Sequence, residues 1–237
     1  MSELIRIDRD LWCAEGDLWM AGQLIHFGVR TTVWREPDGL VLLSPIAPGP
    51  WMDEIDALGP VKTIMAPNLM HHLFLRPAKE RWPSAELVGP PGLPEKRSNL
   101  HFDRVVDGEE REAIGPNSQL FPVRGAPKMN ELVVFHRPSS TLIVTDLIFN
   151  VQDPQGLLTS VVLSIAGALR RTGQSRVWHL LVKDRTAAKQ SVLPLTQLPV
   201  QRLVVAHGDV VEDASPELVA QALKWMISAP DPAPART

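Results

Sequence analysis

Histidine and aspartate side chains follow three short apolar segments of this 237-residue chain. His71 and His72 come soon after the first segment, Asp146 closes the second, and His207 follows the third. Side chains at the ends of separate strands can converge on one site, and three imidazoles with one carboxylate are suitable ligands for zinc, iron or manganese. We therefore take these four residues as candidate metal ligands, with zinc as the expected ion and iron or manganese as alternatives.

Each candidate ligand also has an ordinary structural interpretation. His71 and His72 could be an exposed loop pair, and Asp146 could cap the turn that follows it. However, a carboxylate that closes an apolar strand is costly to bury without a cation or several hydrogen-bond donors. His207 stands in the sequence Ala-His-Gly-Asp, where a glycine lets the backbone turn sharply after the strand.

His136 and Glu131 are weaker candidates. They lie five positions apart on one expected strand, so their side chains point to opposite faces of the sheet. At most one of them can face the site, and the sequence leaves the roles of both open.

The segments that must position these residues alternate between strands and helices. Pro37 and Gly39 indicate a hairpin turn, and the strands 131–136 and 141–145 should pair as a second hairpin. Strands are expected at 4–7, 11–14, 29–35, 40–44, 61–66, 86–89, 119–124, 131–136, 141–145 and 202–206. Helices are expected near 51–58, at 157–171, from 184 to about 194, and after an N-cap at Ser215.

The order of these elements is two runs of strands, each followed by helices. This order favours an α+β fold, an αβ/βα four-layer sandwich in which two mixed sheets pack face to face with helices on the outer faces. The length and the 44% hydrophobic composition fit one domain, residues 1–229. The proline-rich tail 230–237 is expected to be disordered.

The composition limits the partners and the compartment. The 24 basic and 27 acidic side chains leave a formal charge of −3, which gives no general attraction to nucleic acid or anionic membranes, so we expect a small-molecule substrate. Cys13 is the one cysteine, which excludes an internal disulfide and a thiolate zinc cluster. The acidic N-terminus does not resemble a secretory signal, and we expect a cytoplasmic protein.

The longest apolar stretch is 157–169, and it is interrupted by serine, threonine and glycine. It falls short of the roughly 20 residues that are needed to span a bilayer. We interpret it as a buried helix. The alternative is a homodimer contact, because this segment has so little polar face.

In the order of its motifs the sequence resembles the metallo-β-lactamase-like superfamily, over residues from about 4 to about 226. It is most similar to an uncharacterised branch in which Pro-Asn-x-x-His-His stands where most members have His-x-His-x-Asp-His. By this resemblance the aspartate of the motif falls on His71 and its last histidine on His72. The bridging aspartate and the final histidine of the family match Asp146 and His207.

The resemblance also implies that one of the family's two metal sites is lost. The three histidines of the first site fall on Pro67, Leu69 and Ala126, which have no ligating side chain. A single, mononuclear site is therefore expected. Because His71 replaces a carboxylate, that site is one charge less negative, which favours zinc or iron over magnesium or calcium. Asn68 lies beside the lost site and could donate a hydrogen bond to a substrate or a water, or could simply be a turn residue.

These residues predict a metal-dependent hydrolase that acts on an ester, thioester, lactone or phosphodiester. Asn68 and Asp209 are the catalytic candidates, and Asp209 could serve as general base or could orient His207. Oxidative chemistry at iron is a weaker variant. The alternative class is a non-catalytic metal- or ligand-binding protein of the same fold. Four ligands with no open coordination position would favour that alternative, because catalytic zinc sites keep one position open.

Overall fold

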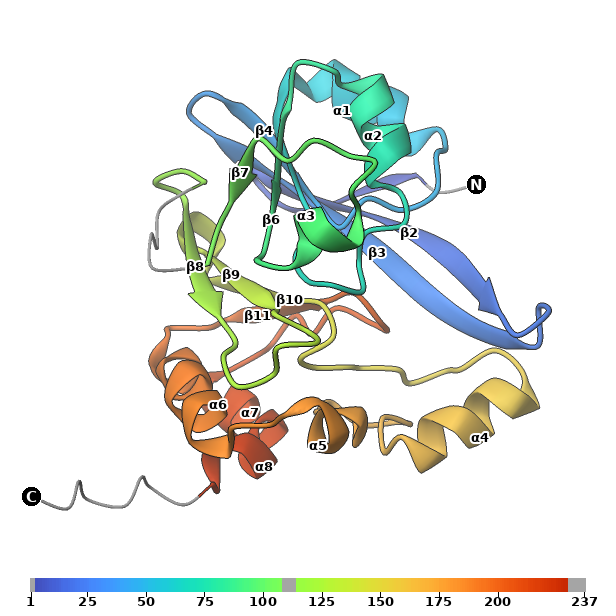
Figure 1. The fold of residues 1–237 in the computed structure, drawn as a ribbon, viewed down its shortest axis with the longest axis vertical. Coiled ribbons are helices and arrows are strands. Elements are labelled where there is room, and N and C mark those ends of the chain that lie inside the picture. Colours follow the sequence, from blue (N-terminus) through green and yellow to red (C-terminus); the bar gives the residue numbers. More distant parts are fainter. Residues whose placement is uncertain (1–2, 108–113, 230–237) are drawn as a thin grey trace, which may run out of the picture.

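Figure 1 shows the computed structural model, which describes residues 3–107 and 114–229. Two sheets lie in the middle of the molecule, with helices on both outer sides. The expected four-layer αβ/βα arrangement is therefore confirmed. The tail 230–237, for which disorder was expected, lies outside the described residues.

The first sheet contains seven strands among the described residues, in chain order. They are β1 (Leu4–Asp8), β2 (Leu11–Met20), β3 (Ile25–Glu36), β4 (Gly39–Leu43), β5 (Val61–Met65), β6 (Glu86–Gly89) and β7 (Arg104–Val105). Neighbours from β1 to β4 are antiparallel, and neighbours from β4 to β7 are parallel. The expected hairpin turn joins β3 to β4, and Gly39 supplies its positive φ of 145°.

The second sheet has the strand order β11-β10-β9-β8. Its strands are β8 (Ser118–Pro122), β9 (Leu132–His136), β10 (Thr141–Val144) and β11 (Arg202–Val205). The expected hairpin of β9 and β10 is confirmed, with the 3-10 helix η1 (Arg137–Ser139) in its turn. β10 and β11 run parallel with Val144 opposite Val205, so the residues that follow them emerge at one edge of the sheet.

The helices lie on the outer faces of the two sheets (Figure 1). α1 (Trp51–Leu58), α2 (Leu75–Arg81) and α3 (Leu93–Lys96) belong to the first half of the chain. The second half contributes α4 (Leu157–Ile165), α5 (Val177–Leu181), α6 (Arg185–Val192), η2 (Leu193–Gln197), α7 (Pro216–Ala222) and α8 (Lys224–Ile227). The side chain of Ser215 accepts from the Leu218 backbone N–H, which confirms the expected N-cap of α7.

Three clusters of buried apolar side chains join the four layers. One joins α1 and α2 to the outer face of the first sheet, and another joins α6, α7 and α8 to the outer face of the second. The third fills the space between the sheets and includes Leu11, Trp34, Leu43, Met65, Ile143 and Val204. Burial of these side chains holds the two sheet edges at a fixed distance from each other.

The hairpin of β2 and β3 is longer than expected. The sequence predicted strands that end at 14 and resume at 29, whereas the observed strands continue to Met20 and return from Ile25. Glycines and acids in this segment mask the alternation of apolar residues. The hairpin extends past the sheets toward α4 (Figure 1), where the His26 backbone N–H donates to Thr159 Oγ1 at 2.9 Å.

The expectation of a buried helix at 157–171 is wrong in two respects. α4 ends at Ile165, and Thr159 and Leu163 are its only buried residues. Leu157 is 88% exposed and Ile165 is 69% exposed. One side of α4 packs against the β2–β3 hairpin, and no described residue covers the other side. The homodimer contact through 157–169 stays a prediction, and none of the described helices has the length and hydropathy to cross a membrane.

His136 makes the stability of this fold depend on pH. Its ring is 1% exposed, Nδ1 lies 2.7 Å from Ser139 Oγ, and Nε2 has no hydrogen-bond partner among the described residues. Burial lowers the pKa of His136 to about 4. The histidine pKa in the unfolded chain is near 6.5, so the unfolded chain binds a proton at His136 as the pH falls from about 6.5 to about 4, and the folded chain does not. The folded state therefore loses stability over this pH range.

The free energy of unfolding of the wild type should decrease between pH 6.5 and pH 4. We predict that His136→Leu makes this decrease smaller, by on the order of 3 kcal/mol. Urea denaturation at several pH values measures this. His101→Leu changes an exposed histidine and serves as the control, with the wild-type slope expected. Parallel curves for wild type and His136→Leu would contradict the assignment.

Candidate metal centre

Three of the four expected ligands meet at one edge of the second sheet. Asp146 and His207 each stand two residues beyond the end of a strand, β10 and β11. These strands are parallel neighbours in register, so the two side chains emerge side by side. His71 comes from the loop after β5 in the first sheet and completes the cluster.

The two imidazoles and both oxygens of the Asp146 carboxylate approach one another closely. His71 Nε2 lies 3.2 Å from His207 Nε2 and 3.3 Å from Asp146 Oδ2, and His207 Nε2 lies 3.4 Å from Asp146 Oδ1. Ligand atoms bound at about 2.0–2.1 Å around a tetrahedral zinc ion stand about 3.3 Å apart. The spacing therefore fits a shared ion. In the part of the chain that the structure describes, no other group of three or more His, Cys, Asp or Glu residues is this close.

Contacts to the far side of each imidazole aim its Nε2 into the cluster. The Gly28 carbonyl accepts from His207 Nδ1 at 2.9 Å, and Ser44 Oγ lies 2.7 Å from His71 Nδ1. A carbonyl only accepts, so Nδ1 of His207 carries a proton and Nε2 of the neutral ring keeps a lone pair for an ion. Phe149 stacks on His207 with ring centroids 5.0 Å apart and fixes the plane of the ring.

Asn68 organises the loop that carries His71. Its Oδ1 accepts from the backbone N–H groups of Met70 and His71, both at 2.8 Å, which confirms the turn interpretation. Its Nδ2 donates to Asp146 Oδ2 at 2.8 Å. Because all of Asn68 is buried in these contacts, it positions two candidate ligands, and it does not line the cavity that the cluster faces.

Glu131 is a fully buried carboxylate beneath the Asp146 loop. It accepts from the backbone N–H groups of Thr145, Asp146 and Leu147 at 2.9 to 3.1 Å. Burial, together with the nearby Asp146 carboxylate, raises the pKa of Glu131 to about 7 in spite of these donors. The role of Glu131, which the sequence left open, is to anchor the backbone from which Asp146 projects.

The electrostatics of the cluster favour positive charge. Burial raises the pKa of Asp146, but His71 and His207 outweigh burial and hold this pKa well below its usual range. Burial lowers the pKa of His207, but the hydrogen bond and charge of Asp146 raise it above its usual value. A partly buried carboxylate that faces two imidazole nitrogens therefore attracts a cation, which can be a proton or a metal ion.

His72 is the one expected ligand that the structure turns elsewhere. Its Nδ1 lies 2.9 Å from Nη1 of Arg97, which also donates to the His72 carbonyl at 2.8 Å. Burial and the charges of Lys96 and Arg97 lower the pKa of His72 to about 4. The side chains of neighbouring loop residues diverge here, so His72 borders the cavity without joining the cluster. Its role as a ligand stays a prediction.

The three positions that would hold a first metal site are buried and serve the core. Leu69 packs in the outer cluster of the first sheet, and Ala126 packs in that of the second. The Pro67 carbonyl accepts from the Leu132 backbone N–H at 2.8 Å and joins the loop to β9. None of the three offers a ligating side-chain atom.

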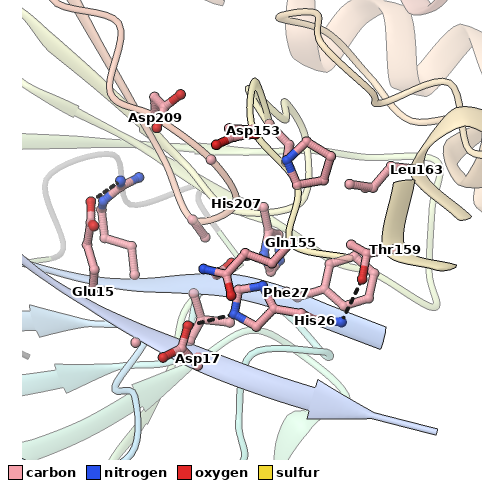
Figure 2. Close-up of a pocket in the computed structure, with 18 of the residues that line it drawn as sticks. Glu15, Asp17, His26, Phe27, Asp153, Gln155, Thr159, Leu163, His207 and Asp209 are labelled. Atoms are coloured by element: carbon pink, nitrogen blue, oxygen red, sulfur yellow. Dashed lines mark hydrogen bonds and ion pairs between the residues drawn. The ribbon is translucent and has the colours of Figure 1, made fainter. Parts of the chain in front are cut away.

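Behind His207 lies a second hollow, of about 540 Å³ (Figure 2). Asp209 lines this hollow with an exposed side chain that stands apart from the His207 ring. The Gly28 carbonyl, rather than Asp209, orients His207. General-base catalysis by Asp209 stays a prediction.

Sequence reasoning did not identify Ser44 or Gly28 as anchors of the site. Ser44 could have been found, because it is a polar residue directly after the apolar strand β4, like the ligands themselves. Gly28 acts through its backbone carbonyl, which carries no sequence signal.

We predict that Asn68→Ala destabilises the protein by on the order of 2 kcal/mol, because Asp146 loses a buried donor and two loop N–H groups lose their acceptor. Urea denaturation measures the change. Asn99→Ala, at an exposed position, is the matched control and should stay within about 0.5 kcal/mol of wild type. Equal stability of the two variants would refute the positioning role.

No protein-family model matches, and a search of curated proteins finds no match. A metallo-β-lactamase from Pontibacter korlensis has a TM-score of 0.64 and 16% identity, covering 97% of this chain and 100% of that one. The FIM-1 metallo-β-lactamase from Pseudomonas aeruginosa, in its mono-zinc form, has a TM-score of 0.63 and 16% identity, covering 95% and 96%.

A metal-soaked Flv1 flavodiiron core from Synechocystis also matches, with a TM-score of 0.63 and 14% identity, covering 95% of this chain and 60% of that one. Two of these three structures are metallo-β-lactamases, and both are covered almost completely. The resemblance that the sequence motifs indicated is therefore confirmed for the fold: this chain has the metallo-β-lactamase fold.

Proposed function

We propose that this chain is a metal-dependent hydrolase with one metal ion held by His71, Asp146 and His207. The close approach of the three side chains, with 3.2 to 3.4 Å between their nearest nitrogen and oxygen atoms, carries the proposal. The fold supports it, because the similar FIM-1 metallo-β-lactamase occurs in a mono-zinc form. Zinc is the proposed ion, and iron or manganese can bind the same donors.

A set of three protein ligands leaves a coordination position open, as in catalytic zinc sites. When bound, a divalent ion supplies Lewis acidity, which polarises a carbonyl oxygen and makes water more acidic. In the hydrolysis of an acyl ester or thioester, the hydroxyl of water joins the acyl carbon. The bond from that carbon to oxygen or sulfur breaks, and the remaining proton goes to the leaving group.

The residues of the chain contribute orientation and charge to this reaction. Gly28 and Ser44 aim the two imidazoles, while Asn68 and Glu131 fix Asp146. Fixed ligands cost little reorganisation when the reaction occurs. Asp209 would have to reach the cluster from the second hollow, so we assign it no step.

Metal content tests the ligand set directly. Wild-type protein should bind about one equivalent of zinc, and His71→Ala or His207→Ala should weaken zinc binding by more than about a hundredfold, because each removes a ligand. Equilibrium dialysis with elemental analysis measures both values. His179→Ala is the control, since His179 stacks on Trp225 away from the cluster. Zinc binding that survives in both ligand variants would overturn the site.

The variant His72→Ala distinguishes a metal site with three protein ligands and an open coordination position from a site with four protein ligands and none open. With three ligands as the complete set, His72→Ala keeps about one equivalent of zinc. Loss of zinc would instead indicate four ligands and no open position, which favours the non-catalytic alternative. Zinc-loaded wild type is then tested on ester, thioester, lactone and phosphodiester substrates. Stoichiometric zinc without turnover of any of them would also favour a binding protein over a hydrolase.

A further inference from the structure

The cluster of His71, Asp146 and His207 faces a cavity of about 540 Å³. Its walls include the β2–β3 hairpin, the loop that carries His71, α4 with the segment after it, and α5. This volume is within the range of small-molecule binding sites. Most of the lining residues are aliphatic or aromatic, among them Met20, Met70, Leu73, Val162, Val177 and Trp178.

The described lining is mostly apolar. It contains one carboxylate, that of Asp146, and no lysine or arginine, and its remaining polar side chains are Ser44, Ser175 and three histidines. Ser44 is already bonded to His71. A phosphate or sugar that entered the cavity would lose its water without gaining donors in return, which is costly. The lining therefore disfavours the phosphodiester among the substrates considered.

Several lining side chains remain exposed to water. Met70 is 53% exposed and Leu73 is 54% exposed, and Met20 and Val177 are also exposed. These residues line the cavity, so a guest that covers them removes apolar surface from water. Methionine side chains adapt their shape to such a guest.

We propose that this cavity binds the straight aliphatic chain of an acyl ester or thioester and places its carbonyl beside His71, Asp146 and His207. The position of the carbonyl rests on the proposed function, whereas binding of the aliphatic chain does not. The apolar walls are continuous with the cluster, and this continuity favours an aliphatic chain that ends in a carbonyl group. Trp178 links the two, since it lines the cavity and its Nε1 donates to the Asp146 carbonyl at 2.6 Å.

Calorimetric titration of the metal-free protein with straight-chain 2-alkanones of increasing length tests the inference without any turnover. These ketones carry one carbonyl group, at the second carbon of the chain, and are not hydrolysed. The Kd should fall roughly three- to fourfold for each added methylene, until the cavity is full. A Kd that does not depend on chain length would overturn the inference.

Two neighbouring valines of α4 provide a matched pair of variants. Val162 lines the cavity, whereas Val161 is exposed and lies outside the lining. Val162→Trp should weaken binding of the longest ketone by about tenfold, because the ring takes the room of two methylenes, and Val161→Trp should bind like wild type. Ala166→Leu fills the same cavity with a smaller group and replaces Val162→Trp if that variant does not fold. Equal weakening by both tryptophans would contradict the assignment.

Hydrolysis of acyl esters of matching chain lengths by zinc-loaded protein separates this inference from the proposed function. If ketone affinity increases with chain length but no ester is hydrolysed, the aliphatic binding site is supported and the proposed hydrolase function is contradicted. If short and long esters are hydrolysed with the same kcat/KM, the hydrolase function is supported and the aliphatic binding site is contradicted. A third outcome is a dimer on size-exclusion chromatography that Val161→Trp converts to a monomer, together with no ketone binding. This result would identify the face as a contact between two copies of the chain and would also overturn the inference.

Discussion

The partly buried carboxylate of Asp146 determines how the parts around the candidate metal centre are arranged. Asp146 stands at the end of an apolar strand, where an unpaired negative charge is costly. Three contacts offset that cost. Nε2 of two histidines faces the Asp146 carboxylate, the side-chain amide of Asn68 donates to it, and the backbone N–H of Asp146 donates to Glu131. Each of these groups also fixes the direction of the carboxylate. The arrangement that stabilises the charge is therefore the one that prepares a cation site.

The two sheets make this arrangement possible because each supplies part of it. The second sheet places Asp146 and His207 side by side through the parallel pairing of β10 and β11. The first sheet supplies His71, its anchor Ser44 and the carbonyl of Gly28. The apolar layer between the sheets holds these two halves together. The apolar cavity arises where α4, α5 and the long β2–β3 hairpin extend beyond that layer.

Much of this could be predicted from the sequence because strands that end in a polar residue are easy to recognise. Asp146 and His207 were found in this way, and so were the hairpin at Gly39 and the N-cap at Ser215. The direction of His72 could not be predicted, since it depends on Arg97, a residue distant in the chain. The exposure of α4 was missed because an apolar composition predicts burial without saying what would cover the helix.

The most direct test of the central claim is a crystal structure of zinc-loaded protein with anomalous scattering at the zinc edge. We expect a single ion, about 2.0–2.2 Å from Nε2 of His71, Nε2 of His207 and a carboxylate oxygen of Asp146, with one further position open to solvent. Two ions in the cleft, or one ion bound away from these three side chains, would contradict it.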